Sequence, residues 1–292
     1  MNTRTATQPA AVLIEHQGHQ AVQLLLSDGA QAVVLLHGGQ VVSWQAPGWG
    51  EQLYLSPQTQ VRPGQAVRGG VPVVFPQFEQ RGPDRSLPRH GLVRTRAWQV
   101  DTLRAGRDHA TATLLRTDDD DTRALWPHGF SLELTVSLAP QRLDMELHVV
   151  NTGDSAWPFS AALHTYLALS ELSLARLQGL EGCRYVDAIT GGEQIEDHPE
   201  KRFAGEIDRI YAATPRNLLL RDGPRRLTIE CEGFEDTVVW NPGPDKCAAL
   251  ADMPDDDWQR MLCIEAAQVL TPPSLAPGES WTGRQSLILP ET

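Results

Sequence analysis

The sequence predicts an all-β protein, built as a large antiparallel β-sandwich with few short helices. Three observations lead to this fold class. Alternating apolar and polar residues recur in short runs along the chain, and turn residues, 24 Gly and 21 Pro, separate these runs. Long amphipathic segments with a helical period are absent from the sequence. Many short strands with few helices are typical of a sandwich or a barrel.

The expected elements follow this alternation from the N-terminus onward. The segments 130–138 (FSLELTVSL) and 143–149 (LDMELHV) alternate at period two, and the Ala-Pro-Gln-Arg between them indicates a hairpin turn. One short helical turn is expected at 122–126, and the acidic run 118–121 before it is expected to be a solvated loop. The full set of expected strands is 31–36, 40–44, 97–103, 110–115, 130–138, 143–149, 226–231 and 280–289.

The length of 292 residues favours a single domain, because all-β domains often reach about 250 residues as one unit. No Pro/Gly/Ser-rich linker divides the chain, so we expect one domain over 1–292, with a flexible N-terminus at 1–10. The N-terminus lacks the apolar core of a signal peptide, and no run of about 18 apolar residues is present that would span a membrane. Four cysteines without metal-binding spacing indicate reduced thiols in a cytoplasmic protein.

The charge balance restricts the partners. A formal net charge of −12 argues against a nucleic-acid partner, because phosphate binding usually leaves a basic surface. It leaves room for a small phosphorylated ligand, which two well-placed arginines are enough to hold. The sequence has no GxSxG elbow, P-loop, GxGxxG or HExxH motif, so no metal or other cofactor is expected.

Two glycine-containing segments carry basic residues. In VRGGVPVVFP, Arg68 stands directly before two glycines, and it lies either at the edge of a site or on a solvent-exposed loop. In PRHGLVR, His90 either donates a hydrogen bond to a ligand hydroxyl or has a structural role. Arg94 in the same segment either pairs with a carboxylate or holds a phosphate through two hydrogen bonds.

Three further polar residues interrupt or border apolar segments. His164 lies in AALHTYL, where period two places it on one face with Tyr166, either within the core or facing a cavity. Glu265 lies in MLCIEAAQV, where an ionised carboxylate is costly unless it is paired or functional. Burial there would raise its pKa toward that of a general base. Asp208, in EIDRIY, lies either near a strand edge or on a surface loop.

Together these residues fit proton transfer on a polyol better than a cofactor reaction. The sequence resembles the hexose-6-phosphate mutarotases (glucose-6-phosphate 1-epimerases), a branch of the aldose 1-epimerase superfamily, over about 33–289. The order and spacing of several segments carry the resemblance. These segments are HGGQVVSW (37–44), VRGGVPVVFPQF (67–78), RHGLVR (89–94), WPHGFSL (126–132), ALHTYL (162–167), GLEGCRYVD (179–187), DRIY (208–211), VVWNP (238–242) and CIEAAQV (263–269).

The resemblance implies a galactose mutarotase-like supersandwich with the site in an open cleft, and it implies that His164 and Glu265 are catalytic. Both side chains should face the cleft, far enough apart to admit a pyranose ring, with Glu265 only partly shielded. The expected substrate-binding residues are Arg68 and Arg94 for the 6-phosphate, His90 and Asp208 for sugar hydroxyls, Gln77, and Trp240 as an aromatic platform.

The function implied is that of a cofactor-free mutarotase, which interconverts the α and β anomers of a hexose 6-phosphate, with glucose 6-phosphate the expected substrate. Glu265, as general base, would take the proton of the anomeric hydroxyl, while protonated His164 gives a proton to the ring oxygen. A monomer is expected. Two departures from the family pattern bear on sugar preference: the segment FPQFEQRG, and Gly243 after VVWNP, which is expected to loosen one wall of the cleft.

Three alternatives stay open. The first is a general aldose 1-epimerase acting on free sugars, which the two arginines disfavour. The second is a carbohydrate-binding protein without turnover, which the presence of both His164 and Glu265 disfavours. The third is an isomerase acting at another carbon, which would remove a C–H proton and would usually need a metal or an enolate stabiliser.

Overall fold

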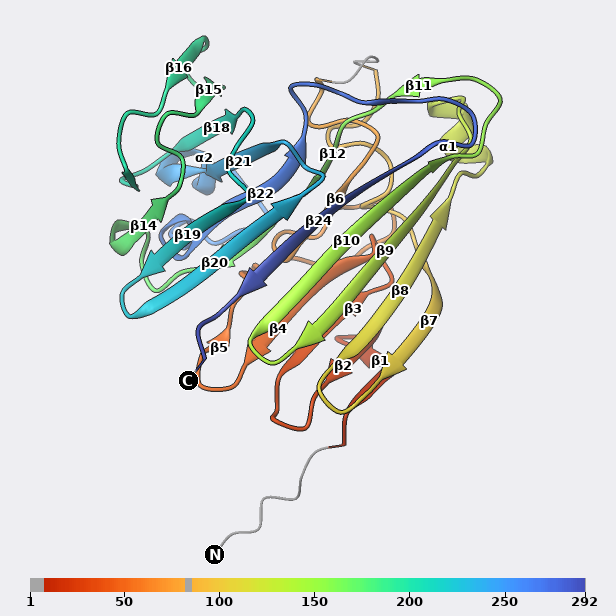
Figure 1. Ribbon diagram of the computed structural model, residues 1–292, viewed down its shortest axis with the longest axis horizontal. Helices are drawn as coiled ribbons and strands as arrows, with labels where there is room; N and C mark the ends of the chain where they lie inside the picture. The colour runs from red at the N-terminus through yellow and green to blue at the C-terminus, as the bar shows by residue number, and fades with distance from the viewer. Residues whose placement is uncertain (1–7, 82–85, 292) are drawn as a thin grey trace, which may run out of the picture.

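The computed structural model describes residues 8–81 and 86–291 and consists mostly of antiparallel strands (Figure 1). Of the N-terminal segment expected to be flexible, residues 1–7 lie outside the described residues, and Ala10 begins the first strand. No helix in the part of the chain described is long and apolar enough to cross a membrane. The helical elements are α1 (Asp120–Leu125), α2 (Gly243–Ala248) and the 3-10 turns η1 (Leu172–Leu174) and η2 (Asp257–Arg260).

A nine-stranded sheet forms one layer of the molecule. In its strands β9 and β10 every second side chain is buried, as the period-two alternation predicts. The register places Leu138 opposite Leu143 and Leu134 opposite Leu147, and all four leucines are buried in the core. The strand order is β17 (Glu200–Arg202), β14 (Ala175–Gln178), β19 (Asn217–Asp222), β20 (Arg225–Glu232), β24 (Ser280–Ile288), β10 (Arg142–Asn151), β9 (Phe130–Ala139), β8 (Ala110–Thr117) and β7 (Gln99–Ala105).

A second sheet carries the candidate site and packs against β24. Buried Gln285 of β24 links the two sheets, because its amide donates to the carbonyl of Ile264 on the central strand β22 at 3.1 Å. Every residue of β22 is buried. The strand order is β16 (Glu193–Ile195), β15 (Arg184–Asp187), β18 (Ile207–Tyr211), β21 (Asp236–Asn241), β22 (Met261–Gln268), β12 (Ala161–Leu163) and β6 (Val73–Val74), and β13 (Tyr166–Ala168) also pairs with β22.

An N-terminal sheet covers the remaining half of the nine-stranded sheet. Its strands β1 and β2 contact β7 and β8, and Figure 1 shows it behind them. Isolated bridges, among them Val41–Val71 and Leu53–Leu167, join it to the sheet that contains β22, so the two form one second layer. The strand order is β1 (Ala10–His16), β2 (His19–Leu25), β3 (Gln31–Leu35), β4 (Gln40–Ala46) and β5 (Gly50–Glu51); β11 (Trp157–Pro158) and β23 (Ser274–Leu275) form a separate pair.

The predicted large antiparallel sandwich with few short helices is therefore confirmed. The eight expected strands are β3, β4, β7, β8, β9, β10, β20 and β24, with ends that differ from the expectation by at most two residues. The acidic run 118–121, in contrast, is not a plain solvated loop. Asp119 caps α1 by accepting from the backbone N–H of Thr122, because the first turn of a helix leaves such donors without partners.

Candidate active site

A cleft with a volume of about 310 Å³ opens on the sheet that contains β22 and gathers most of the residues expected in the site. Its floor comes from β18, β21, β22 and the connection between β12 and β13. Its walls come from residues within 66–72, 78–79, 89–94 and 246–252. The expected residues that line it are Arg68, His90, Arg94, His164, Asp208, Trp240 and Glu265.

Strand register explains why residues far apart in the sequence meet here. Asp208 of β18 pairs with Trp240 of β21, and Trp240 pairs with Cys263 of β22. Cys263 in turn pairs with Tyr166 of β13, which completes one row across four strands. Glu265 lies two residues after Cys263, so its side chain points to the same face of the sheet.

His164 lies in a break that the sequence did not predict. The strand-like segment 161–167 divides into β12 and β13 at His164 and Thr165, where the backbone N–H of Thr165 donates to the carbonyl of Leu163 at 2.9 Å. The backbone N–H of His164 bonds to the carbonyl of Pro72 at 3.0 Å, next to the pairing of β12 with β6. Both halves still pair with β22 on either side of the break. The imidazole is therefore placed beside the middle of β22, next to Glu265.

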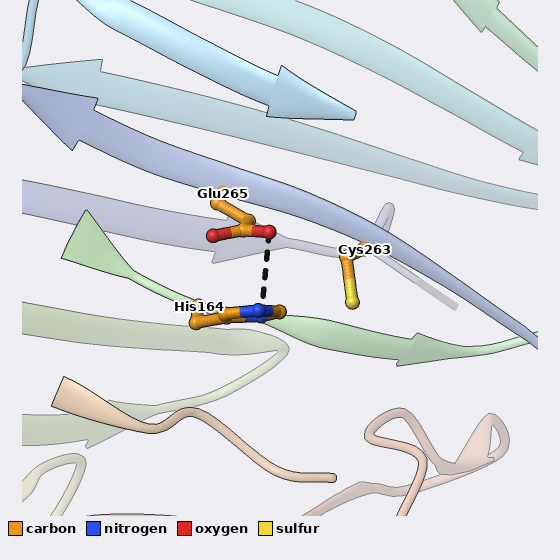
Figure 2. Close-up of side chains that lie close together, drawn as sticks. All are labelled: His164, Cys263 and Glu265. Carbon is orange, nitrogen blue, oxygen red and sulfur yellow. Dashed lines mark ion pairs between the residues drawn. The ribbon is translucent and has the colours of Figure 1, made fainter. Parts of the chain in front are cut away.

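The two expected catalytic side chains are in direct contact. His164 Nδ1 lies 3.3 Å from Glu265 Oε1 (Figure 2). The expectation that a pyranose ring would fit between them is therefore wrong. Glu265 is also more deeply buried than expected, with only 1% of its surface exposed. Within the described residues, His164 Nδ1 and Glu265 Oε2 have no hydrogen-bond partner.

Burial shifts the pKa values of both members of this pair. It raises the pKa of Glu265 well above its usual value, and the charge of Asp208 acts in the same direction. Burial also lowers the pKa of His164 well below its usual value, and the positive charge of Arg94 lowers it further. Both shifts favour the neutral form of each group in the free protein. The expectation that His164 acts as the acid and Glu265 as the base stays a prediction.

Two aromatic side chains hold the imidazole of His164 in place. Tyr166 stacks on it, with ring centroids 4.8 Å apart and an interplanar angle of 8°. Trp240, the expected platform, is partly buried and approaches the imidazole edge-on, with centroids 6.2 Å apart. The hydroxyl of Tyr166 accepts a hydrogen bond from Arg68 Nη1 at 3.2 Å, so Tyr166 connects His164 to the basic side of the cleft.

Three arginines line the cleft and differ in their partners. Arg68 Nε lies 3.2 Å from the carboxylate of Asp252, and Arg89 Nη2 lies 2.7 Å from that of Glu79. Arg94 has no carboxylate partner among the described residues; its Nη2 donates to the carbonyl of Arg89, and its buried Nε has no partner there. Burial, with the charges of Arg68 and Arg89, lowers the pKa of Arg94 to about 10, so it stays protonated at neutral pH.

A hydrogen-bond donor, His90, and an acceptor, Asp208, both line the cleft. His90 Nδ1 accepts from the backbone N–H of Glu79 at 3.3 Å, so the neutral ring carries its proton on Nε2. Burial lowers the pKa of His90 well below its usual value, which keeps the ring neutral. Asp208 is partly buried on β18, and burial, followed by the charge of Glu79, raises its pKa to about 6.

Gln77 does not line the cleft, contrary to the expectation that it binds substrate. It is fully buried, and its amide donates to the carbonyls of Leu87 and Pro88 at 3.0 and 3.2 Å. Gln77 therefore holds the segment that leads to His90. A buried amide facing two backbone carbonyls satisfies them, which is a structural role.

Gly243 does not line the cleft either, and the expectation that a glycine here loosens a cleft wall stays a prediction. It begins α2 with φ +62°, and a Cβ at this position would lie 2.6 Å from the backbone nitrogen of Glu206. The backbone conformation and this close approach require glycine.

Sequence reasoning missed several lining residues: Tyr166, Glu79, Arg89, Lys246 and Asp252. Tyr166 was placed on the same face as His164 by period two, so its signal was present but was not assigned a role. Arg89 is next to His90 in the sequence. Asp252 is 184 residues from its partner Arg68, and no local pattern relates the two.

Comparison with known proteins identifies the family of this chain. A family model described as "Aldose 1-epimerase" matches residues 21–287. A protein of Cenchrus ciliaris named "Putative glucose-6-phosphate 1-epimerase" is 34% identical over 292 residues, which cover 96% of this chain and 88% of the relative. A protein of Escherichia coli K12 with the same name is 30% identical over 253 residues, covering 84% of this chain and 83% of the relative.

The fold is shared with solved structures. The chain matches the "putative mutarotase (YeaD) from Salmonella typhimurium" with a TM-score of 0.87 and 23% identity, over 97% of each chain. A "galactose mutarotase-like protein" from Clostridium acetobutylicum matches with a TM-score of 0.73 and 18% identity, over 97% of this chain and 99% of the other. The sandwich is thus the fold of galactose mutarotase-like proteins. The chain belongs to the aldose 1-epimerase family, as the resemblance in the sequence predicted.

Proposed function

We propose that this protein is a mutarotase, an isomerase that interconverts the α and β anomers of a hexose 6-phosphate, with glucose 6-phosphate as substrate. The observation that carries the proposal is the convergence of three groups in one cleft. These are the contacting pair His164 and Glu265, and Arg94, whose charge is not neutralised by any described carboxylate. Two relatives named as glucose-6-phosphate 1-epimerases support the same reaction and substrate.

The contact between His164 and Glu265 suits a proton relay. Glu265 Oε2, which has no partner among the described residues, takes the proton of the anomeric hydroxyl. Once the substrate aligns the two atoms, which lie 3.3 Å apart in the free protein, Glu265 Oε1 passes its own proton to His164 Nδ1, and His164 Nε2 gives a proton to the ring oxygen. The C1–O5 bond breaks and leaves an aldehyde and a C5 hydroxyl. After rotation about C1–C2, the reverse relay closes the ring on the other face of C1.

The relay keeps the predicted roles, with Glu265 as base toward the hydroxyl and His164 as acid toward the ring oxygen. It needs no charge separation in the free protein, which agrees with the neutral pair that burial favours. Each positioned donor or acceptor typically contributes about 10²–10⁴-fold to the rate.

The basic side of the cleft supports a phosphorylated substrate over a free sugar. Arg94 offers a buried Nε–H without a partner, and guanidinium groups bind phosphate through two hydrogen bonds. Arg68 contributes a second guanidinium, although Asp252 and the hydroxyl of Tyr166 already engage it. In this proposal, His90 Nε2 donates to one sugar hydroxyl and Asp208 accepts from another.

We also propose that the protein acts as a monomeric single domain in the cytoplasm. The largest core cluster contains residues from Val22 to Leu289, which supports one domain. The groups that the proposed reaction uses, His164, Glu265 and Arg94, all belong to one described cleft. The four cysteines are free, as expected in a reducing compartment.

The experiment measures anomer exchange of glucose 6-phosphate and of glucose by NMR, with and without the protein. We expect efficient exchange of glucose 6-phosphate only. Arg94→Gln should lower kcat/KM for glucose 6-phosphate by about tenfold to a hundredfold, since a charge-assisted hydrogen bond contributes about 1.5–3 kcal/mol. Arg96→Gln is the matched control, because Arg96 does not line the cleft and pairs with Asp121.

Three outcomes would contradict the proposal. Equal efficiency on both sugars would indicate an aldose 1-epimerase for free sugars. Binding of glucose 6-phosphate without faster exchange would indicate a carbohydrate-binding protein. Solvent deuterium at C2 during turnover would indicate an isomerase that removes a C–H proton.

A further inference from the structure

Cys263, a residue type that can bind a metal as His and Glu can, lies beside the pair His164 and Glu265. The sulfur of Cys263, a nitrogen of His164 and a carboxylate oxygen of Glu265 all lie within 4.8 Å of one another. Cys263 and Glu265 are both on β22, two residues apart, and Figure 2 shows both side chains on the side of the strand that faces His164. No metal-ligand spacing is visible in the sequence, because only the fold brings His164 to this strand.

The polar atoms of this group are desolvated and incompletely bonded. His164 and Glu265 are buried, and His164 Nδ1 and Glu265 Oε2 have no hydrogen-bond partner among the described residues. A buried polar atom without a partner lowers the stability of the fold, and a ligand that engages it removes this cost. Cys263 is fully buried in a small cluster with Tyr166 and Met261, and the proposed reaction does not use its thiol.

We propose that His164, Cys263 and Glu265 form an inhibitory site for a borderline-soft divalent cation of the Zn²⁺ class. One nitrogen, one sulfur and one oxygen are the donors that zinc selects, whereas Mg²⁺ prefers oxygen ligands only. Three protein ligands leave the fourth tetrahedral position open, here toward the cleft. Because zinc bonds are about 2.0–2.3 Å long, the ligand atoms must draw together by about 1 Å.

The groups around the three ligands favour reversible binding of the cation over permanent binding. The positive charges of Arg68 and Arg94 lie near the pair and act against a cation, and the thiol must lose its proton on binding. A bound cation would coordinate the carboxylate oxygen of Glu265 and the imidazole nitrogen of His164 that the proton relay needs. The cation therefore inhibits anomer exchange; only this inhibition, and not the binding itself, rests on the proposed function.

The test measures binding of Zn²⁺ to the untagged protein by calorimetry, and the near-ultraviolet thiolate charge-transfer absorption with Co²⁺. Wild-type protein should bind one Zn²⁺ and show the Co²⁺–thiolate absorption. Cys263→Ala should remove that absorption and weaken Zn²⁺ binding by more than about tenfold, because it removes a ligand rather than an outer partner. Cys247→Ala is the matched control, since Cys247 is a buried thiol of the same small cluster outside the trio.

Anomer exchange then tests the consequence. Zn²⁺ should inhibit the wild-type protein and Cys247→Ala, should leave Cys263→Ala active, and Mg²⁺ should inhibit none of them. Undiminished Zn²⁺ binding by Cys263→Ala, or no binding by the wild-type protein, overturns the site. If Cys263→Ala does not fold, Cys263→Ser keeps the size of the side chain and takes its place. A protein that binds Zn²⁺ through Cys263 but lacks anomer exchange contradicts the proposed function and leaves the metal site standing.

Discussion

At the residue scale, the character of the site follows from a carboxyl group placed where water is excluded. Glu265 is buried, and its Oε1 lies 3.3 Å from His164 Nδ1. Burial disfavours the charged form of both groups, so each shifts toward neutrality. The same placement that makes the pair suited to passing one proton also makes Glu265 a source of instability once it ionises.

Replacing Glu265 tests both consequences. Glu265→Gln should lower kcat for anomer exchange by at least about a hundredfold, because an amide neither takes nor relays the proton. Glu146→Gln, on the nine-stranded sheet away from the cleft, should leave kcat unchanged. Exchange by Glu265→Gln at the wild-type rate would remove Glu265 from the mechanism.

The same variant should change the pH dependence of stability. Unfolded Glu265 ionises near its ordinary pKa of 4.5, whereas its pKa in the folded protein is raised. Between these two values the folded state retains a proton that the unfolded state has lost, so the free energy of unfolding falls as pH rises. Glu265→Gln removes this term, so its Tm relative to wild type should increase from about pH 5 to about pH 8. A Tm difference that is constant or falls over this range would contradict the raised pKa.

Asp208 should set a pH dependence of substrate binding. Its pKa of about 6 means that the carboxylate, the stronger hydrogen-bond acceptor, is lost as pH falls through that value. We expect KM for glucose 6-phosphate to rise several-fold below about pH 6, and to rise less in Asp208→Asn. Because the substrate phosphate also titrates near pH 6, the wild-type profile must be compared with that of the variant. Identical profiles for the two proteins would exclude a role for Asp208.

At the element scale, the cleft depends on segments whose backbones approach closely. Gly91 follows His90 in the segment that delivers His90 and Arg94 to the cleft. Its φ is +77°, and a Cβ there would lie 2.0 Å from the carbonyl oxygen of Phe75. The neighbouring N–H of Leu92 donates to the same carbonyl, so the two segments are held in direct contact.

Gly91→Ala should therefore destabilise the fold and displace His90. Gly64→Ala is a close control, because Gly64 has φ +75° and nothing within 4 Å of its added Cβ. The left-handed conformation alone costs about 1–2 kcal/mol in each variant, and the backbone clash adds to this only at Gly91. Urea unfolding should show a larger loss for Gly91→Ala, with a loss of activity that Gly64→Ala lacks. Equal losses in both variants would mean that the clash is relieved by a local shift.

At the scale of the whole molecule, one strand, β22, faces the hydrophobic core on one side and the cleft on the other. Ile264 and Ala266 of β22 belong to the main core cluster, whereas Glu265 lines the cleft on the opposite face. The chain carries a net charge of −12, yet three arginines meet at the cleft, so its local charge opposes that of the molecule. The electrostatic interaction with a ligand in the cleft is set mainly by these nearby groups, because charges beyond about 10 Å are largely screened by salt.

The sequence by itself determined the strands and the family, because period-two alternation and turn residues are local signals that burial on one face of a sheet imposes. It also identified seven residues that line the cleft. Only the tertiary structure decided how they meet. The break at His164 and the register of β22 bring His164, Cys263 and Glu265 together, and they leave Gln77 outside the cleft. Contact, burial and charge state depend on strand pairings between distant segments, and no local pattern encodes these pairings.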